Sequence, residues 1–366
     1  MMSKLSPRLI HQISGSPFER GQQVAAASHA QRAAVLARIG AVAESYFTQD
    51  ERDWIARMWE LQQRHLPEVC AYVEGLAAGM DIAPEQLFGA HFRYAVDDLR
   101  RAPAGGEECS SFILRGPEGL ILAKNRDNPL VMRPAQSWLE QVDPAWGKRQ
   151  VISVSTYGSS TSASSGMNSD GLAMTDTAVR TFDIGPGVLR YYLMDAVLQR
   201  CGSVAEAVDF VRSLPHLGGG NLFLADASGA GAILEIGHRN LHVEWLATEG
   251  EGPNWIMRTN HFLSDPLRRS LCEKPGSAHF TNSSKRYAFI RSQLQTLSAP
   301  SVAAAQAILA SHLETEEFAP ICRHEESVGT LSGVIFEPAK GKMLQSTGTP
   351  CQADWMERGF RDAVLA

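Results

Sequence analysis

The pattern of hydrophobic and polar positions divides the chain into a helical part and a strand-rich part. Up to about residue 100, apolar residues recur at helical spacing. The pattern predicts helices over residues 24–47, 51–66, 67–78 and 84–99. A helix start precedes them, because Ser16 can cap a helix that has Pro17 at its first position and Glu19 three residues after the cap.

Short apolar runs of strand length dominate the chain after residue 108. Glycine-containing turns separate many of these runs, which favours antiparallel pairing. The predicted strands cover residues 109–114, 120–124, 151–156, 172–176, 221–226, 231–236, 241–246, 254–258, 330–336 and 342–346. Helices are expected between them over residues 190–199, 205–214, 284–296 and 302–312. Many strands with helices grouped in blocks predict an α+β fold of two packed sheets covered by helices.

The composition is that of an ordinary globular protein and excludes some partners. The chain has 366 residues, of which 44% are hydrophobic and 20% charged, enough for one large domain or two modest ones. A net charge of -6 gives no basic footprint, so we expect no nucleic-acid partner. No apolar run reaches the roughly 18–20 residues that span a bilayer, so we expect no membrane partner. The first residues lead into no long apolar stretch, and no secretory signal is expected.

The cysteines are widely spread and form no Cys-x-x-Cys pair. This usage fits reduced thiols and a cytoplasmic location rather than a disulfide-stapled fold. Most of the six are expected to be inert packing residues. The six are Cys70, Cys109, Cys201, Cys272, Cys322 and Cys351.

One cysteine stands at the start of a predicted hairpin. Cys109 opens the first strand, and Lys124-Asn125-Arg126-Asp127 closes the second. An antiparallel hairpin brings its outer ends together, so Cys109 and Asp127 are expected to be neighbours in space. A thiol, a carboxylate and cationic side chains together are typical of a nucleophile site. The alternative is a packing cysteine beside a turn aspartate.

Cleavage of the Glu108–Cys109 bond would make Cys109 an N-terminal residue. Its α-amine would then have a pKa near 8 and could act as general base for its own thiol. In this interpretation Asp127 holds and orients the amine.

Two further segments are candidates for the site. Asn260 follows a predicted strand, where its amide could donate to an oxyanion, and losing one such donor costs about 2.7–4 kcal/mol in a well-studied hydrolase. An asparagine that caps a turn is the alternative. Thr175, Asp176 and Thr177 follow the predicted Asn168–Gly171 turn and are expected at or near the pocket.

Cys322-Arg323-His324 contains the spacing Cys-x-His, which could ligate a metal. The sequence offers no second pair to complete a site, so no metal is expected. Arg323 is instead a candidate to bind a carboxylate or to orient the site.

The order and spacing of several short motifs resemble a known family. The chain resembles the acyl-CoA:6-aminopenicillanate (isopenicillin N) acyltransferase family of self-processing N-terminal-nucleophile enzymes. It is more distantly similar to the choloylglycine hydrolases. The matching segments are Gly15–Gly21, Cys109–Ser111, Asn125–Asp127, Asn168 with Gly171-Leu172, Asn221–Asp226 with Glu235, and Thr259–His261.

The resemblance implies an αββα four-layer sandwich with a mainly helical N-terminal segment. Residues 1–108 would be a pro-segment that stays bound as a small subunit, and residues 109–366 the catalytic large subunit. Carried over by position, Cys109 is the nucleophile, Asp127 orients its amine and Asn260 stabilises the oxyanion. Lys124 stands where choloylglycine hydrolases carry an active-site arginine. No metal or organic cofactor is implied.

One residue departs from the pattern of the family. Glu108 precedes the nucleophile where the acyltransferase has glycine, and a bulky anion there is expected to slow self-cleavage. The Gly105-Gly106 pair relieves the steric part of this effect.

The expected activity is hydrolysis of a linear N-acyl amide through an acyl-thioester on Cys109. Transfer of an acyl group from acyl-CoA to an amine is the alternative, and the absence of a CoA-phosphate motif favours hydrolysis. A non-catalytic binding protein on the same fold is a further alternative, against which the intact set Cys109, Asp127 and Asn260 argues.

Overall fold

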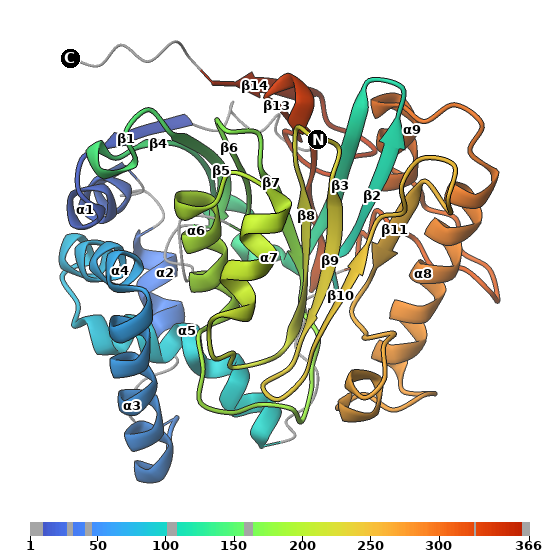
Figure 1. Ribbon diagram of the computed structural model, residues 1–366. Coiled ribbons are helices and arrows are strands. Elements are labelled where there is room, and N and C mark those ends of the chain that lie inside the picture. The colour runs from blue at the N-terminus through green and yellow to red at the C-terminus, as the bar shows by residue number, and fades with distance from the viewer. Residues whose placement is uncertain are drawn as a thin grey trace, which may run out of the picture.

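Two β-sheets pack face to face, and helices cover the outer side of each sheet (Figure 1). This computed structural model describes residues 10–27, 32–40, 46–100, 108–156, 164–325 and 327–360. The layers follow one another as helices, sheet, sheet and helices. The architecture is therefore the αββα sandwich of the α+β class that the sequence predicts.

The first sheet has eight strands in the order β1-β4-β5-β6-β7-β8-β9-β10. Strand β1 pairs with β4 in parallel, and the other neighbours are antiparallel. The strands are β1 (Ile10–Ser14), β4 (Gln136–Val142), β5 (Gln150–Thr156), β6 (Ser165–Asn168), β7 (Ala173–Thr177), β8 (Gly220–Ala225), β9 (Gly231–Ile236) and β10 (Leu241–Trp245).

The second sheet has six antiparallel strands in the order β11-β2-β3-β12-β13-β14. The hairpin of β2 and β3 lies between β11 and β12, and in it Ser110 pairs with Asn125. The strands are β11 (Trp255–Arg258), β2 (Ser110–Gly116), β3 (Gly119–Pro129), β12 (Val328–Glu337), β13 (Lys342–Ser346) and β14 (Trp355–Gly359).

Two groups of helices form the outer layers (Figure 1). The first group shares one hydrophobic core with the first sheet: α1 (Pro17–Ala27), α2 (Arg32–Gly40), α3 (Gln49–His65), α4 (Pro67–Met80), α5 (Pro84–Leu99), α6 (Arg190–Arg200) and α7 (Val204–Arg212). The second group, α8 (Ala278–Thr296) and α9 (Val302–Leu309), packs on the second sheet. Short 3₁₀ turns are η2 (Leu130–Ala135), η3 (Pro144–Trp146), η4 (Leu267–Ser270) and η5 (Pro338–Lys340).

The continuous apolar runs of the central hairpin reflect burial on both faces. Phe112 and Leu114 pack against α8 and α9, whereas Ile113 between them belongs to the core between the two sheets. Successive side chains of a strand point to opposite faces, so a strand covered on both sides needs apolar residues at every position.

Most predicted elements recur with small shifts at their ends, but α8 begins at Ala278 rather than at residue 284 and β3 ends at Pro129 rather than at residue 124. Four strands were not predicted. Strands β1, β4, β6 and β14 are short or rich in polar residues, and none contains the apolar alternation that signals a strand. Of the helix expected over 24–47, the structure describes the end of α1, up to Ala27, and α2 over Arg32–Gly40; residues 28–31 and 41–45 lie outside the described part. The predicted start signal is present, because Glu19 accepts hydrogen bonds from the backbone and hydroxyl of Ser16.

The N-terminal segment is packed into the rest of the molecule. It supplies the edge strand β1, and its helices share a core with α6 and α7. Arg20 on α1 is fully buried and donates to Asp143 at 2.9 Å and to Gln141 at 3.0 Å. Its guanidinium also lies 4.3 Å from the centre of the Trp146 ring. One buried cation therefore ties the segment before Cys109 to the part after it.

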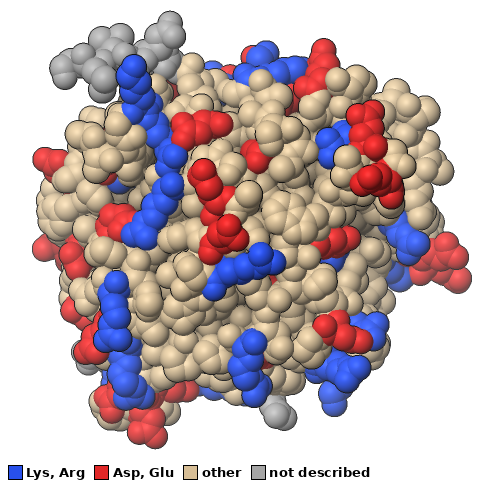
Figure 2. Space-filling model, viewed as in Figure 1, with Lys and Arg blue, Asp and Glu red and all other residues tan. Residues whose placement is uncertain are grey.

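The surface, the helices and the cysteines each add one observation. On the face shown in Figure 2, basic and acidic side chains are interspersed. None of the described helices is long and apolar enough to cross a membrane. The structure describes all six cysteines, and no disulfide joins any two of them.

We predict that Arg20→Met destabilises the folded chain strongly. The substitution leaves the buried Asp143 carboxylate without its cation, which typically costs about 3–5 kcal/mol. The measurement is the free energy of unfolding in urea, made on the Cys109→Ala chain, which lacks the thiol that is expected to cut the chain. Arg93→Met is the control, because Arg93 is 42% exposed in its pair with Asp97 and should cost less than about 1 kcal/mol. Equal losses in the two variants would contradict the role given to Arg20.

Candidate active site

The hairpin of β2 and β3 brings a thiol to the end of strand β3. Cys109 directly precedes β2, and its Sγ lies 3.9 Å from the backbone carbonyl oxygen of Asp127. Both residues are buried. The neighbourhood of Cys109 and Asp127 that the hairpin pattern predicts is therefore observed.

A buried arginine links this cysteine to the candidate oxyanion residue. Arg286 on α8 donates from Nη1 to the carbonyl oxygen of Cys109 at 2.9 Å and to Oγ of Ser110 at 2.8 Å. Its Nη2 donates to Oδ1 of Asn260 at 2.9 Å. One guanidinium therefore holds the residue at the start of β2 and the residue two positions after β11 in a fixed relation.

Sequence reasoning missed Arg286, although α8 contains a signal for it. The buried positions of this helix include Ser283, Arg286, Ile290 and Leu294, which are spaced three or four residues apart. Such spacing defines one face of a helix. A charged residue on an otherwise buried face needs a partner inside the protein, and that requirement marks it as a candidate.

The side-chain amide of Asn260 is oriented by its neighbours. Arg286 can only donate, so the atom that it contacts must be the amide oxygen, and the amide nitrogen points the other way. Nδ2 donates one hydrogen to the carbonyl oxygen of Ala178 at 2.8 Å. The backbone N–H of Asn260 donates a hydrogen bond to Oγ of Ser283 at 2.8 Å. Among the described residues no acceptor takes the second hydrogen of Nδ2, which leaves it able to bind an oxyanion.

Asp127 is a buried carboxyl group with one satisfied oxygen. Its Oδ1 accepts a hydrogen bond from Oγ1 of Thr330 at 2.6 Å. Its Oδ2 is buried and accepts no hydrogen bond from any described residue. Burial raises the pKa of Asp127 to about 7, against the opposing effects of the Arg286 charge and the Thr330 hydroxyl. The site therefore holds a carboxyl group that is ready to bind a donor or a cation.

The residue before Cys109 has its own binding site. The Glu108 carboxylate forms an ion pair with Arg323 and contacts Nδ1 of His279 at 3.1 Å. Burial lowers the pKa of His279 to about 4, so its imidazole is neutral at pH 7 and its contact with Glu108 is a hydrogen bond. Arg323 also pairs with Glu325. Arg323 thus pairs with two carboxylates of this chain, and its role in the site stays a prediction.

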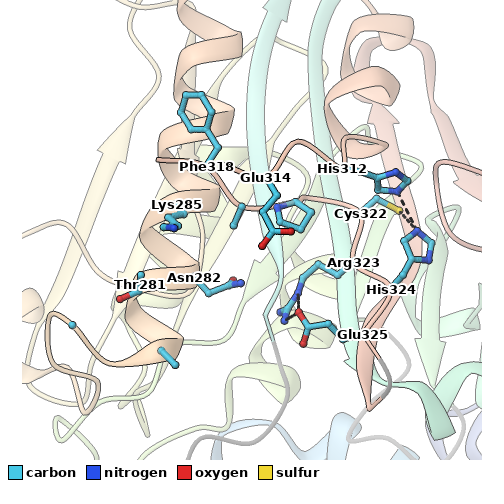
Figure 3. A pocket seen from close by; sticks show the side chains of 14 residues that line it. Thr281, Asn282, Lys285, His312, Glu314, Phe318, Cys322, Arg323, His324 and Glu325 are labelled. Atoms are coloured by element: carbon cyan, nitrogen blue, oxygen red, sulfur yellow. Dashed lines mark hydrogen bonds and ion pairs between the residues drawn. The ribbon is translucent and has the colours of Figure 1, made fainter. Parts of the chain in front are cut away.

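A pocket of about 730 Å³ adjoins this ion pair (Figure 3). One wall is the start of α8, where Asn282 accepts a hydrogen bond from Nε of Arg286 at 2.7 Å. The other wall is the segment from His312 to Glu325, which includes Arg323. Asn282 and Arg286 thus connect one wall of the pocket to the Cys109 carbonyl, and Arg323 connects the other wall to Glu108.

Several other candidates make contacts in the interior of the protein, and of all the candidate catalytic and substrate-binding residues only Arg323 lines the pocket. Lys124 on β3 pairs with Asp176 on β7 at 2.5 Å, and Arg190 binds the same carboxylate at 2.9 Å. Thr175 contacts the Ser111 hydroxyl at 2.7 Å. The Lys124–Asp176 and Thr175–Ser111 contacts join the two sheets, whereas the Arg190–Asp176 contact joins α6 to the first sheet.

The remaining candidates are also occupied by structural contacts. Thr177 donates to the backbone oxygen of Thr259 at 2.6 Å. Asn125 uses both amide hydrogens on the carbonyl oxygens of Leu309 and Ile321, at 2.8 and 3.0 Å. Arg126 is buried on β3, paired in register with Ser332.

The premise that Cys322 and His324 have no second ligand pair is wrong. His312 and Cys351 lie beside them, and the four candidate ligand atoms are within 4.8 Å of one another. His312 comes from the start of the segment after α9, and Cys351 from the loop after β13. Sequence spacing could not reveal this cluster, because its members are brought together only by the folded chain.

The fold and the site define a class of protein. An αββα sandwich with a cysteine at the start of an inner strand, a carboxyl group beside it and an amide donor nearby is typical of the N-terminal-nucleophile hydrolases. The chain belongs to the acyl-coenzyme A:6-aminopenicillanic acid acyl-transferase family, whose model matches residues 114–351, more than half of the chain. The matched range begins after Cys109 and includes Asp127 and Asn260. The protein is therefore an enzyme of the amidohydrolase or acyltransferase type.

Solved structures of low sequence identity are also similar. Penicillin V acylase from Agrobacterium tumefaciens is 15% identical, over 69% of this chain and 86% of that chain, with a TM-score of 0.43. Two variants of the conjugated bile acid hydrolase from Clostridium perfringens are 12% and 13% identical, over 69% of this chain and 97% of theirs, with TM-scores of 0.40 and 0.43. A comparison with curated protein sequences finds no match.

We predict that the buried carboxyl group of Asp127 makes the uncut chain less stable as the pH rises. The unfolded pKa of an aspartate is about 3.9, and the folded pKa here is about 7. The folded state therefore keeps a proton that the unfolded state loses, and this contribution is complete below about pH 4 and lost through about pH 7. Asp127→Asn in the Cys109→Ala chain should remove the dependence. The free energy of unfolding of this double variant, minus that of the Cys109→Ala chain, should rise by roughly a few kcal/mol between pH 4 and pH 8.

The exposed Asp354→Asn substitution serves as the control for this titration. Because the side chain of Asp354 is exposed, this variant shows how the loss of one surface carboxylate changes the pH profile. A difference for Asp127→Asn that follows the same profile as this control would show that Asp127 does not titrate with an altered pKa.

Proposed function

We propose that the protein is a self-processing cysteine amidohydrolase. It cleaves its own Glu108–Cys109 bond and then hydrolyses a linear N-acyl amide through an acyl-thioester on Cys109. The observation that supports this most directly is the Arg286 guanidinium, which binds both the Cys109 carbonyl and the Asn260 amide. Residues that act on one carbonyl group must keep a fixed relation, and a buried bidentate group provides it.

Self-cleavage would begin with attack of Sγ of Cys109 on the carbonyl carbon of Glu108. The C–N bond to Cys109 breaks, its nitrogen gains a proton, and Glu108 becomes a thioester on the sulfur. Water then hydrolyses the thioester. Glu108 is left with a free α-carboxylate at the end of the first fragment, and the thiol of Cys109 is restored. Arg323 and His279 support this step, because they hold the Glu108 side chain beside the bond that breaks.

The new α-amine would then serve the catalytic cycle. Its pKa near 8 allows it to accept the proton of the Cys109 thiol at neutral pH. Asp127 is the proposed partner of the amine, and its buried Oδ2 is the acceptor that would take an N–H. A positive ammonium group at this position would lower the pKa of Asp127 from its value in the uncut chain.

Turnover follows the same chemistry on a substrate. Sγ attacks the acyl carbonyl, and the second hydrogen of Asn260 Nδ2 stabilises the oxyanion that forms. The amine leaves with the proton taken from the thiol, and water hydrolyses the acyl-thioester to a carboxylic acid and the thiol. The amide substrate and water are the only reactants that this cycle consumes.

The pocket suggests a substrate that carries a carboxylate. Arg323 lines the pocket and binds Glu108 before cleavage. Once the peptide bond is cut, the Glu108 end can move away, and the guanidinium can bind an anion from the substrate. We therefore propose N-acyl amino acids as the first class to test.

Residues 1–108 would remain bound as the partner fragment, because β1 and the buried Arg20 tie them to the catalytic part. Reduced thiols favour a cytoplasmic location.

An acyl-CoA-dependent N-acyltransferase is the second candidate, because the family to which the chain belongs is named for that activity. In this case an amine takes the place of water in the last step, and the acyl group reaches Cys109 from a thioester.

We predict that the purified chain consists of two fragments, residues 1–108 and 109–366. Cys109→Ala should leave a single full-length chain, because the attacking sulfur is absent. Intact-protein mass spectrometry under denaturing conditions measures both masses. Cys272→Ala is the matched control, since it removes a thiol far from the hairpin in sequence and should leave cleavage unchanged. The proposal would be contradicted if the wild-type chain stays uncut and Cys109 does not react with thiol-reactive acyl probes.

We predict that Asn260→Ala lowers kcat for acyl-amide hydrolysis about 10²–10³-fold, because one oxyanion donor is lost. The rates are measured on matured protein with a panel of N-acyl amino acids, neutral N-acyl amides, and acyl-CoA with amine acceptors. Asn254→Ala, an exposed residue just before β11, should leave kcat unchanged. Turnover only with acyl-CoA and an amine would favour the acyltransferase, and an unchanged kcat in Asn260→Ala would remove Asn260 from the mechanism.

A further inference from the structure

We propose that His312, Cys322, His324 and Cys351 bind a zinc ion. Two thiols and two imidazoles are a ligand set typical of structural zinc sites. Their four ligand atoms lie within 4.8 Å of one another. In Figure 3 the side chains of His312, Cys322 and His324 converge on one point at the edge of the pocket.

The distances between the ligand atoms match a tetrahedron around zinc. With Zn–N of 2.0–2.1 Å and Zn–S of 2.3 Å, the edges of a tetrahedron are about 3.3 Å between two nitrogens and about 3.6 Å between nitrogen and sulfur. Nε2 of His324 lies 3.1 Å from Nε2 of His312, 3.6 Å from Sγ of Cys322 and 3.2 Å from Sγ of Cys351. Little movement is needed for all four atoms to reach one ion.

Hydrogen bonding does not account for this convergence. Nε2 of His324 has either one hydrogen or one lone pair, so it can form at most one good hydrogen bond. It nevertheless lies close to three other polar atoms. A cation that accepts a lone pair from each of the four atoms satisfies them together. Thiolate and imidazole ligands select zinc over the hard cations magnesium and calcium.

The fold builds the cluster from three segments. The carbonyl oxygen of Ser311 accepts hydrogen bonds from the backbone N–H groups of Ile321 and Cys322, which places the next residue, His312, beside Cys322. Cys322 and His324 are two positions apart and so can face the same side of an extended segment. The loop between β13 and β14 adds Cys351.

The site has four protein ligands, which indicates a structural ion rather than one that activates water. It also adjoins the groups around Asp127. Oγ1 of Thr330 accepts from the backbone N–H of Arg323 at 2.9 Å and donates to Asp127. The ion would therefore fix the segment that carries Arg323 against the strand that carries Thr330.

Metal content of the purified full chain tests the proposal directly. We expect one zinc ion per chain by elemental analysis and native mass spectrometry, with loss of nearly all zinc in Cys351→Ser and in His324→Ala. Cys272→Ser and the exposed His242→Ala are matched controls that should keep the full zinc content. Removal of zinc by a chelator should lower the Tm of the wild type and not that of Cys351→Ser.

Cobalt keeps the test decisive if a ligand variant does not fold. Zinc-depleted wild type, reduced and then given cobalt(II) chloride, should develop the strong visible absorption of tetrahedral cobalt with thiolate ligands. Cys322 and Cys351 should resist alkylation while the metal is bound and react after chelation. A reduced wild type that takes up neither zinc nor cobalt, or a Cys322–Cys351 disulfide in place of metal, would overturn the proposal.

Discussion

The buried charge of Arg286 is the constraint on which the arrangement of the site depends. A guanidinium that is taken out of water costs several kcal/mol unless it is paired and hydrogen-bonded. Here its acceptors come from the start of β2, from the segment after β11 and from α8 itself. Moving any of these elements would leave donors unsatisfied. The requirement for pairing therefore fixes the helix, the hairpin and Asn260 relative to one another.

A second set of buried charges holds the two sheets together. Asp176 on the first sheet binds Lys124 from the second sheet, and Glu235 on the first sheet binds Arg258 from the second at 2.6 Å. Elsewhere the space between the sheets is filled by apolar side chains. Apolar contacts tolerate small slips of one sheet over the other, whereas a paired charge does not. The polar pairs thus protect the alignment that places β2, β3 and β11 around Cys109.

How much the sequence predicts depends on how local each feature is. The hairpin of Cys109 and Asp127 could be predicted, because turn residues and apolar runs fix its geometry within about twenty positions. Arg286 could not, because its role depends on which face of α8 meets which strand. The His312 and Cys351 contacts also arise from tertiary packing, and strands such as β1 gain their stability from a neighbour rather than from their own pattern. Thr175, Asp176 and Thr177 were expected at or near the pocket, and their contacts with other elements could not be predicted, because those contacts depend on how the two sheets pack.

The environment of Glu108 explains how this chain can carry an anion where the acyltransferases it resembles have glycine. An unpaired carboxylate beside Cys109 would oppose ionisation of the thiol. The structure pairs this carboxylate with Arg323 and a neutral His279 instead. Arg323 belongs to the segment that Asn125 and Thr330 bind from strands β3 and β12. The Glu108 side chain is therefore held by a binding site built from other parts of the chain. In the proposed self-cleavage these contacts would position the peptide bond and offset the expected effect of the anion.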